Sequence, residues 1–437
     1  MTQCNSQQLV FKPFFRRRVV ADFGGGTITS DAGGLLLREA DRRLRLTEAL
    51  AGCVADTRQT TKTRHSVVEM LRQRVYGIAL GYEDLNDHDH LRSDELMKLL
   101  VDRDHSLASS PTLCRFENSV ERNVLSTMSG VFVEKFIESF KTPPTELVLD
   151  FDATDDQVHG TQEGRFFHGY YDCYCFLPLY VFCGQKLLVA YLRPSKIDAS
   201  KHAWAILSLL VKRFRQAWSD VPIIVRADSA FARWKMMRWC DKNRVHYLFG
   251  LAKNTRLEEA SQTLCREAQK RFDQTGLKQR LFGELRYAAY TWDAERRIIV
   301  KAEHSAQGAN PRYVVTNLEG DPQELYDRLY VQRGEMENRI KEQQLQLFAD
   351  RTSAHKFLTN QFRLLLASAA YALVEFIRSA ALHGTELAKA QCATIRVKLF
   401  KIGARIVRSV RRIVVHLATG YPYRILLHTA LSRLVPT

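Results

Sequence analysis

The sequence predicts an α/β fold: a mixed sheet with helices on its faces, a β-rich insertion, an N-terminal helical region and a basic C-terminal helical region. Two observations predict the sheet. Short apolar runs such as "ELVLDFDAT" (146–154) and "VPIIVRADSAF" (221–231) are typical of strands, and helical stretches such as "SKHAWAILSLLVKRFRQAW" (200–218) lie between them. A third observation concerns partners: the 437 residues carry a net charge of +16. Such a surplus favours a polyanion, nucleic acid first.

Residues 1–140 are predicted to be mainly helical and to bind DNA. Stretches such as "SDAGGLLLREADRRLRLTEALAG" place apolar residues at helical spacing. The glycine-rich "GGGTITSDAGG" lacks the GK[ST] of a phosphate loop, so we expect a turn there. The basic "FKPFFRRR" is a weaker candidate for a DNA-binding arm, and "KTPPTE" marks the end of the region.

The next part of the chain reads as three strands, a helix, a strand, a helix and a strand, up to residue 251. Residues 252–325 break this order with strands such as "PRYVVTNLE", which indicates a β-rich insertion. The helical pattern then returns. We therefore expect residues 141–251 and 326–390 to form one core on either side of the insertion.

Three carboxylate positions suggest chemistry. On a strand alternate residues share a face, so Asp150 and Asp152 point the same way, and either one could act. Asp228 follows an apolar strand, where a sheet meets solvent and ligand, although a helix cap is the simpler reading. Glu337 lies in "YVQRGEMENRIKE" (330–342), which is predicted to be helical.

This predicted helix has two stripes of side chains. One stripe follows spacings of three, four, four and three, and consists of Tyr330, Arg333, Glu337, Lys341 and Gln344. The neighbouring stripe is apolar and consists of Met336, Ile340 and Leu347. A helix built this way packs its apolar stripe on a sheet and leaves Glu337 at the rim of the contact.

Separated carboxylates without Cys or His partners suit a hard cation, Mg²⁺ with Mn²⁺ as a possible substitute. Two such ions stabilise the attacking and leaving oxygens of an in-line phosphoryl displacement. The residues therefore predict a catalytic and metal-binding set of Asp150 or Asp152, Asp228 and Glu337, in a basic protein that cuts or rejoins a nucleic-acid backbone.

The motifs resemble the DDE transposases of bacterial insertion sequences, in the group with a Tyr-x2-Arg-x3-Glu-x6-Lys signature. "YVQRGEME" supplies the Tyr, Arg and Glu of that signature. Gln344 stands where the final Lys is expected, and Lys341, one turn earlier, is the nearest basic group. "LDFDAT" resembles the strand with the first catalytic Asp, which is placed at Asp152 because it precedes x-Thr, with Asp150 as runner-up. "RADSAF" resembles the motif of the second, Asp228.

The resemblance implies an RNase H-like catalytic core with a β-rich insertion between the second Asp and the Glu. It implies two-metal cutting of insertion-sequence ends and joining of the 3′ ends to target DNA, by a homodimer on paired ends. Tyr330, Arg333 and Lys341 are then expected to contact DNA. Trp292, in "YTWDAERR", is by this resemblance a candidate to stack on a flipped base, although a core role is the more common one for such a Trp.

The C-terminal segment 391–437 holds nine Lys and Arg residues and no Asp or Glu. Lys401, Arg405, Arg408 and Arg412 are spaced by four, three and four, which predicts one face of a helix. We expect this face to contact DNA phosphates, and a solvated face is the alternative.

Other functions remain open on the sequence alone. A metal-dependent nuclease without strand transfer needs the same carboxylates, and a domesticated DNA-binding protein needs only the basic surface. The positive charge argues against a glycoside hydrolase. Nine cysteines without a CxxC pair indicate reduced thiols. With no signal-peptide pattern and no membrane span expected, the predicted location is the bacterial cytoplasm, in association with the nucleoid through DNA.

Overall fold

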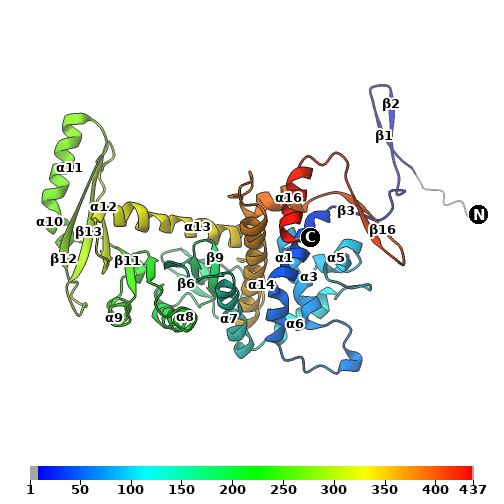
Figure 1. Ribbon diagram of the computed structural model, residues 1–437, viewed down its shortest axis with the longest axis horizontal. Helices are drawn as coiled ribbons and strands as arrows, with labels where there is room; N and C mark the ends of the chain where they lie inside the picture. The colour runs from blue at the N-terminus through cyan, green and yellow to red at the C-terminus, as the bar shows by residue number, and fades with distance from the viewer. Residues whose placement is uncertain (1–7, 436–437) are drawn as a thin grey trace, which may run out of the picture. The chain divides into compact units, whose positions relative to one another are not determined.

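The computed structural model describes residues 8–435; residues 1–7 and 436–437, at the ends of the predicted N-terminal region and tail, lie outside it. The chain forms two compact units (Figure 1). We call Glu117–Ala372 the central unit, and Met1–Phe116 together with Leu373–Thr437 the terminal unit. The terminal unit is thus assembled from both ends of the chain.

The terminal unit is mainly helical and differs from the predicted region 1–140, because residues 117–140 belong to the central unit. Its helices are α1 (Leu35–Leu44), α2 (Leu46–Gly52), α3 (Val67–Leu80), α4 (Asp87–Leu91), α5 (Glu95–Leu100), most of α6 (Ser110–Ser119), α15 (Cys392–Ile395) and α16 (Arg424–Leu434). Helix α3 begins at a capping box in which Ser66 and Glu69 satisfy each other's backbone N–H groups. The candidate arm "FKPFFRRR" lies in an exposed antiparallel hairpin of β1 (Leu9–Phe14) and β2 (Arg17–Ala21).

The two ends of the chain meet inside the terminal unit. Lys401 Nζ forms an ion pair with Asp31 Oδ1 at 2.7 Å. The guanidinium of Arg43 donates to the backbone oxygen of Arg433 at 2.8 Å, and strand β3 (Ile28–Thr29) pairs with a strand from the tail. These contacts join segments that lie more than 300 residues apart in the sequence.

The predicted helix through the basic tail is wrong for residues 404–417, which form an antiparallel hairpin. Its strands are β16 (Ala404–Arg408) and β17 (Ile413–Leu417). The burial of β16 alternates with a period of two, since Ala404 and Ile406 are buried while the side chains between them are exposed. β-branched residues on both sides of "RSVRR" favour strands, and this preference overrides the helical spacing of the arginines. Helical structure remains on either side of the hairpin.

The central unit is built on one large mixed sheet, as predicted. Within residues 8–435 this sheet has nine strands in the order β12-β13-β15-β11-β10-β4-β8-β9, with β14 paired to β13. Strands β4, β10 and β11 are mutually parallel and the remaining pairs are antiparallel. The strands are β4 (Leu147–Ala153), β8 (Leu179–Cys183), β9 (Lys186–Tyr191), β10 (Ile223–Ala227), β11 (His246–Leu251), β12 (Gln279–Tyr287), β13 (Arg296–Ser305), β14 (Gly308–Ala309) and β15 (Arg312–Thr316). A small separate sheet contains β5 (Asp156–Gln157), β6 (Phe166–His168) and β7 (Cys173–Phe176).

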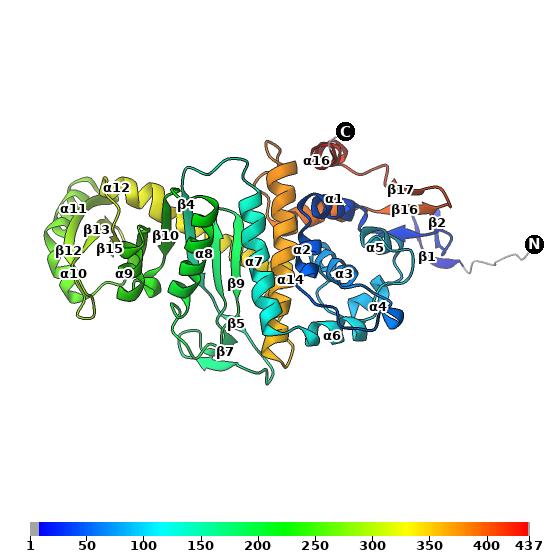
Figure 2. The same cartoon turned by 60° about the horizontal axis from the view of Figure 1, so that its bottom comes forward.

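Helices cover both faces of the large sheet. On one face, Leu149, Phe151 and Val225 belong to a core with residues of α7 (Arg122–Glu138), α8 (Ala203–Ala217) and α9 (Trp234–Lys242). Figure 2 shows α7 and α8 alongside β4, β9 and β10. On the other face, Ile224 and Leu248 pack under a long helical stretch that includes Tyr326. Each core strand therefore alternates its side chains between two helical layers.

The long helical stretch on the second face is not a uniform α-helix. It begins with α12 (Pro322–Glu324), continues as a π-helical segment (Leu325–Tyr330) and a 3₁₀ turn (Val331–Arg333), and becomes α13 (Gly334–Lys341). A second π-helical segment (Glu342–Gln346) ends it. The predicted apolar stripe is confirmed, because Met336, Ile340 and Leu347 are buried.

The insertion does not fold as a separate β domain. Its helices α10 (Thr255–Ala260) and α11 (Gln262–Thr275) pack on strands β12, β13 and β15, and those strands extend the central sheet from the edge of β11. Figure 1 shows α11 running beside β12. The predicted β-rich character is present, while the continuity of the sheet was not predicted.

Among the described residues, one helical stretch, Phe357–Ala381, is long and apolar enough to cross a membrane by length and composition. It contains α14 (Phe357–Phe376) and a π-helical segment (Ile377–Ala381). Within its most apolar window 78% of the residues are buried inside the protein, which is the pattern of a core helix.

Candidate active site

The first two predicted carboxylates start from neighbouring positions on paired strands. In the parallel pair β4–β10, Phe151 lies opposite Ala227, and Asp152 and Asp228 come directly after them. Adjacent strands are about 4.8 Å apart, so the two side chains leave the backbone at the same edge of the sheet. Asp228 also caps the 3₁₀ turn Ser229–Phe231, since its Oδ1 accepts a hydrogen bond from the Ala230 N–H at 2.9 Å. Asp228 therefore occupies both positions that the sequence suggested: it follows a strand, and it caps a helical turn.

Glu337 lies in the helical layer, and Arg333 links it to this edge of the sheet. Arg333, one turn before Glu337, donates from Nη2 to Glu337 Oε1 at 3.0 Å. Its Nη1 lies 3.6 Å from Asp152 Oδ2. The side chain of Glu337 is half exposed, whereas Asp152 and Arg333 are largely enclosed. One guanidinium therefore links the carboxylate of β4 to the carboxylate of α13.

The electrostatics of Asp152 and Asp228 depend on each other and on the nearby charges of Glu337 and Arg333. Burial raises the pKa of Asp152 to about 7; the charges of Asp228 and Glu337 add to the shift, and Arg333 opposes it. Burial also raises the pKa of Asp228, with a further contribution from Glu337, while backbone hydrogen bonds and Arg333 counteract the rise. A cluster of this kind, in which like charges perturb one another at a strand edge, is typical of functional sites.

The donor set fits a hard divalent cation by its chemistry. It offers three carboxylates, and their mutual repulsion would be relieved by added positive charge. Across residues 8–435, no group of three or more His, Cys, Asp or Glu side chains is arranged closely enough to hold a metal ion. In this arrangement Arg333 supplies the neutralising charge instead, through its contacts with Asp152 and Glu337.

Sequence comparison decides the family. The profile of the family described as transposase DDE domain group 1 matches residues 11–437. The chain belongs to this family. A DDE transposase domain implies polynucleotidyl transferase or endonuclease activity, and the mixed α/β sheet is consistent with a transposase catalytic fold. A search of curated proteins finds no match.

Seven chains of solved structures are similar to this transposase. One is the piggyBac transposase in a cryo-EM structure of its synaptic complex with hairpin DNA. The two share 10% sequence identity, and the alignment covers 85% of this chain and 80% of that chain with a TM-score of 0.43.

The structure distinguishes Asp150 from Asp152 in this transposase. Arg226 donates from Nε and Nη2 to the two oxygens of Asp150, each at 2.7 Å. Asp150 and Arg226 are 3% and 6% exposed, so both oxygens of Asp150 are engaged inside the protein. Asp152 is the carboxylate of β4 that faces Arg333 and the edge of the sheet. Sequence reasoning missed Arg226, whose only signal is one charged residue inside the apolar run "IIVRA".

Tyr330 of the transposase is half-buried beside Asp228. Burial raises the pKa of its hydroxyl, and the charge of Asp228 contributes to the rise. Its hydroxyl lies so close to Gly250 that a Cβ at Gly250 would be 2.5 Å from it. Lys341 is exposed at the end of α13. Gln344, which occupies the signature Lys position, donates from Nε2 to the backbone oxygen of Asp155 at 2.8 Å, so it ties the helix to the loop after β4.

The structure does not bring Trp292 to the carboxylates. The loop that contains it follows the paired ends of β12 and β13, where Arg296 donates to the hydroxyl of Tyr247 at 2.9 Å. Tyr247 lies near the start of β11, whereas Asp228 lies near its far end. Trp292 packs edge-on against Tyr287, with ring centroids 5.6 Å apart, at the border of the core. The alternative of a core Trp is therefore the better description.

The tail arginines occupy different places on the hairpin of the terminal unit. Arg408 is held by two acidic side chains, with Nη1 3.4 Å from Glu95 and Nη2 bonded to Asp104. Arg405 is exposed on β16, and Arg412 is exposed in the turn with Arg411. Arg405 and Arg412 remain accessible to a partner, although not from a shared helix face.

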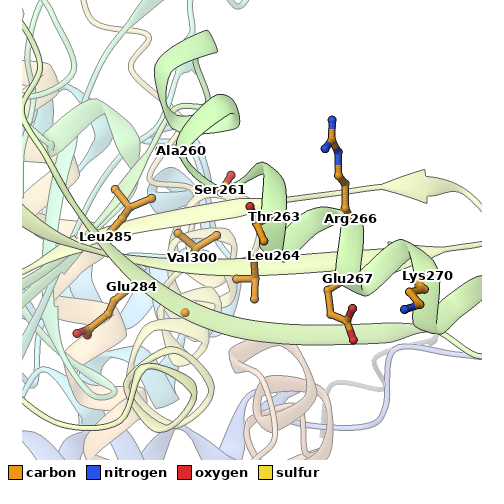
Figure 3. A pocket seen from close by; sticks show the side chains of 11 residues that line it. Ala260, Ser261, Thr263, Leu264, Arg266, Glu267, Lys270, Glu284, Leu285 and Val300 are labelled. Atoms are coloured by element: carbon orange, nitrogen blue, oxygen red, sulfur yellow. The ribbon is translucent and has the colours of Figure 1, made fainter.

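A cavity of about 670 Å³ lies in the insertion, between α11 and strands β12 and β13 (Figure 3). Its apolar lining includes Leu264 from α11 and Leu285 and Val300 from the strands, and Arg266 and Lys270 of α11 also line it. None of the carboxylates discussed above lines it.

Proposed function

We propose that this chain is the transposase of a bacterial insertion sequence, which cuts the ends of its element and joins the 3′ ends to target DNA. The observation that carries the proposal is the linked set of Asp152, Asp228 and Glu337, on two adjacent strand ends and one helix, in which the pKa values of Asp152 and Asp228 are raised. Family membership supports the reaction class. We propose that this catalytic fold is RNase H-like, because Asp152 and Asp228 follow adjacent parallel strands and Glu337 lies on the helical stretch that covers the same sheet.

The three carboxylates would hold Mg²⁺, or Mn²⁺ in its place. When bound, two such ions stabilise the charge on the attacking and leaving oxygens of an in-line phosphoryl displacement. Asp228 is already oriented by its bond from the Ala230 N–H. Positive charge added at the carboxylates would weaken the hold of Asp152 and Glu337 on Arg333, and its guanidinium would then be able to contact a DNA phosphate. We propose that Tyr330 and Lys341 contact the same DNA strand.

The basic hairpin of the terminal unit supplies further phosphate contacts in this proposal. Arg405, Arg411 and Arg412 are exposed, and no acidic residue lies between 391 and 437. Contacts of this type position DNA without reading its sequence. We further propose that two copies of the chain act together on paired element ends, as a cytoplasmic protein that reaches the nucleoid through DNA.

A charge-neutral substitution tests the assignment. Glu337→Gln should abolish cleavage of linear DNA that carries the inverted repeats flanking its own gene, while binding to that DNA changes by less than about twofold. The matched control is Glu335→Gln, because Glu335 is 70% exposed on the same helix and contacts Arg339 rather than Arg333. Near wild-type cleavage by the Glu337 variant would refute the assignment. Cleavage without joined products in the wild type would identify a nuclease on this fold.

A further inference from the structure

One buried guanidinium joins the three elements that carry the carboxylates. Arg226 on β10 donates from Nε and Nη2 to Asp150 on β4, each at 2.7 Å. Its third nitrogen, Nη1, donates to the backbone oxygen of Leu329 at 2.5 Å. Leu329 belongs to the π-helical segment that leads into α13. These partners lie 76 and 103 residues away from Arg226 in the sequence.

Each end of this linkage lies close to a carboxylate of the site. Arg226 is two residues before Asp228, and Asp150 is two residues before Asp152. In the parallel register of β4 and β10, Arg226 and Asp150 are directly opposite each other. Because side chains of a strand alternate, the pair lies on the sheet face from which Asp152 emerges. The helical layer covers this face.

The pair is buried beside an apolar core. Arg226 is 6% exposed and Asp150 is 3% exposed, and Ile224 and Leu248 form the core beside them. A buried ion pair adds little net stability, since the loss of hydration offsets the attraction, but it fixes a geometry. The planar fork of an arginine satisfies both oxygens of a carboxylate and keeps one nitrogen for a third partner.

Leu329 lies next to the last residue of the π-helical segment, where the helix changes its form. The hydrogen-bonding pattern changes there from π (Leu325–Tyr330) to 3₁₀ (Val331–Arg333) and then to α. Such changes inside a helix are associated with functional hinges. They also alter the direction in which the following side chains point, and Arg333 and Glu337 follow directly.

We infer that Arg226 is a positioning residue for the transposase reaction: through Asp150 and the backbone of Leu329, it fixes α13 so that Glu337 faces Asp152 and Asp228. The role rests on the proposed function. Arg226 touches neither metal nor DNA, because Asp150 and the helical layer enclose it. It acts by setting distances among groups that do, and a displacement of about 1 Å in such a site can cost about 100-fold in rate.

Arg226→Lys tests the inference, because lysine keeps the charge and loses the fork. We expect kcat for end cleavage to fall about 10- to 100-fold, the range typical of residues that orient metal ligands. The affinity of the DNA-free protein for Mn²⁺, measured by EPR titration, should fall by a similar factor. The dissociation constant for end DNA should change by less than about twofold.

Arg363→Lys is the matched control. Arg363 donates from Nε to the buried carboxylate of Glu117 at 2.8 Å, away from the site. It should lose stability without a change in Mn²⁺ affinity. Should the Arg226 variant fold poorly, Asp150→Asn with Arg226→Gln avoids an unpaired buried charge and is expected to show the same losses.

Several outcomes would overturn the inference. If a folded Arg226 variant binds Mn²⁺ and cleaves as the wild type does, the residue has no positioning role. If neither Arg226 variant folds, as judged by circular dichroism, its role is structural. A wild-type protein that neither binds Mn²⁺ nor cleaves would refute the proposed function itself, and the inference with it.

Discussion

Replacing the first carboxylate should make the metal-free protein more stable. Burial raises the pKa of Asp152 to about 7 in the folded protein, against about 3.9 in an unfolded chain. Between these values the folded protein keeps a proton that the unfolded chain releases, so stability falls as the pH rises through this window. Above about pH 7 the whole penalty for ionising a buried group is present. Asp152→Asn removes the ionisation and therefore the penalty.

The size of the effect follows from the shift in pKa. About three pKa units at 1.36 kcal/mol each give an upper limit of about 4 kcal/mol at pH 8. At pH 5.5 only about half of that window has been crossed, so the gain should be about 2 kcal/mol. For a cooperative unit of about 250 residues, 1 kcal/mol shifts Tm by about 2 °C. The variant should therefore melt about 8 °C above the wild type at pH 8 and about 4 °C above it at pH 5.5.

Thermal unfolding in EDTA at the two pH values measures this. Asp150→Asn is the control on the same strand: it leaves the charge of Arg226 buried without its partner and should cost about 3–5 kcal/mol. Saturating Mg²⁺ at about 100 times its Kd should stabilise the wild type by about 2.7 kcal/mol and the Asp152 variant much less. An Asp152 variant less stable than the wild type at pH 8, or an equal difference at both pH values, would refute the reasoning.

Three further predictions concern residues around the site and on the hairpin. Gly250→Ala should lower the free energy of unfolding by about 1–3 kcal/mol, because its Cβ would be 2.5 Å from the hydroxyl of Tyr330. Thermal unfolding should show that adding Tyr330→Phe restores the lost stability. If it does not, the clash lies elsewhere. Changing Arg411 and Arg412 to Gln should flatten the log–log salt dependence of binding by about 0.9 for each phosphate that is no longer neutralised, for specific and random duplexes alike; an unchanged slope would mean that the hairpin does not touch DNA. Trp292→Ala should lower the free energy of unfolding by about 2–3 kcal/mol and leave cleavage per folded molecule unchanged; reduced cleavage at unchanged stability would restore the base-stacking role.

The sequence was sufficient for features that depend on local pattern. Apolar runs identified β4 and β10, and the spacing of Met336, Ile340 and Leu347 identified the buried stripe of the helical stretch that carries Glu337. These elements could be predicted because the spacing of their apolar residues and the residue types indicate the same structure. The catalytic roles of the three carboxylates stay predictions that the proposed experiments test.

Features that depend on contacts between residues far apart in the sequence could not be predicted. The choice between Asp150 and Asp152 turns on Arg226, which lies 76 residues from Asp150 and becomes its neighbour only through the strand register. In the tail, Lys401, Arg405, Arg408 and Arg412 have helical spacing, whereas the β-branched residues around them favour strands. Strands form there, and one of them pairs with Ile28 and Thr29. The spacing of residues in the tail could not decide between a helix and a hairpin, because the strand that pairs with β16 comes from the N-terminal part of the chain.

The split origin of the terminal unit sets an order of events during synthesis. The central unit is one continuous segment that is complete once residue 372 has been made, whereas the terminal unit waits for the segment 373–437. At about 5 to 20 residues per second, those last residues take about 3 to 13 s to translate. During that interval the N-terminal helices lack strand β16 and the ion pair of Lys401 with Asp31. Premature termination between codons 373 and 437 therefore damages a unit whose other part, residues up to 116, has already been translated.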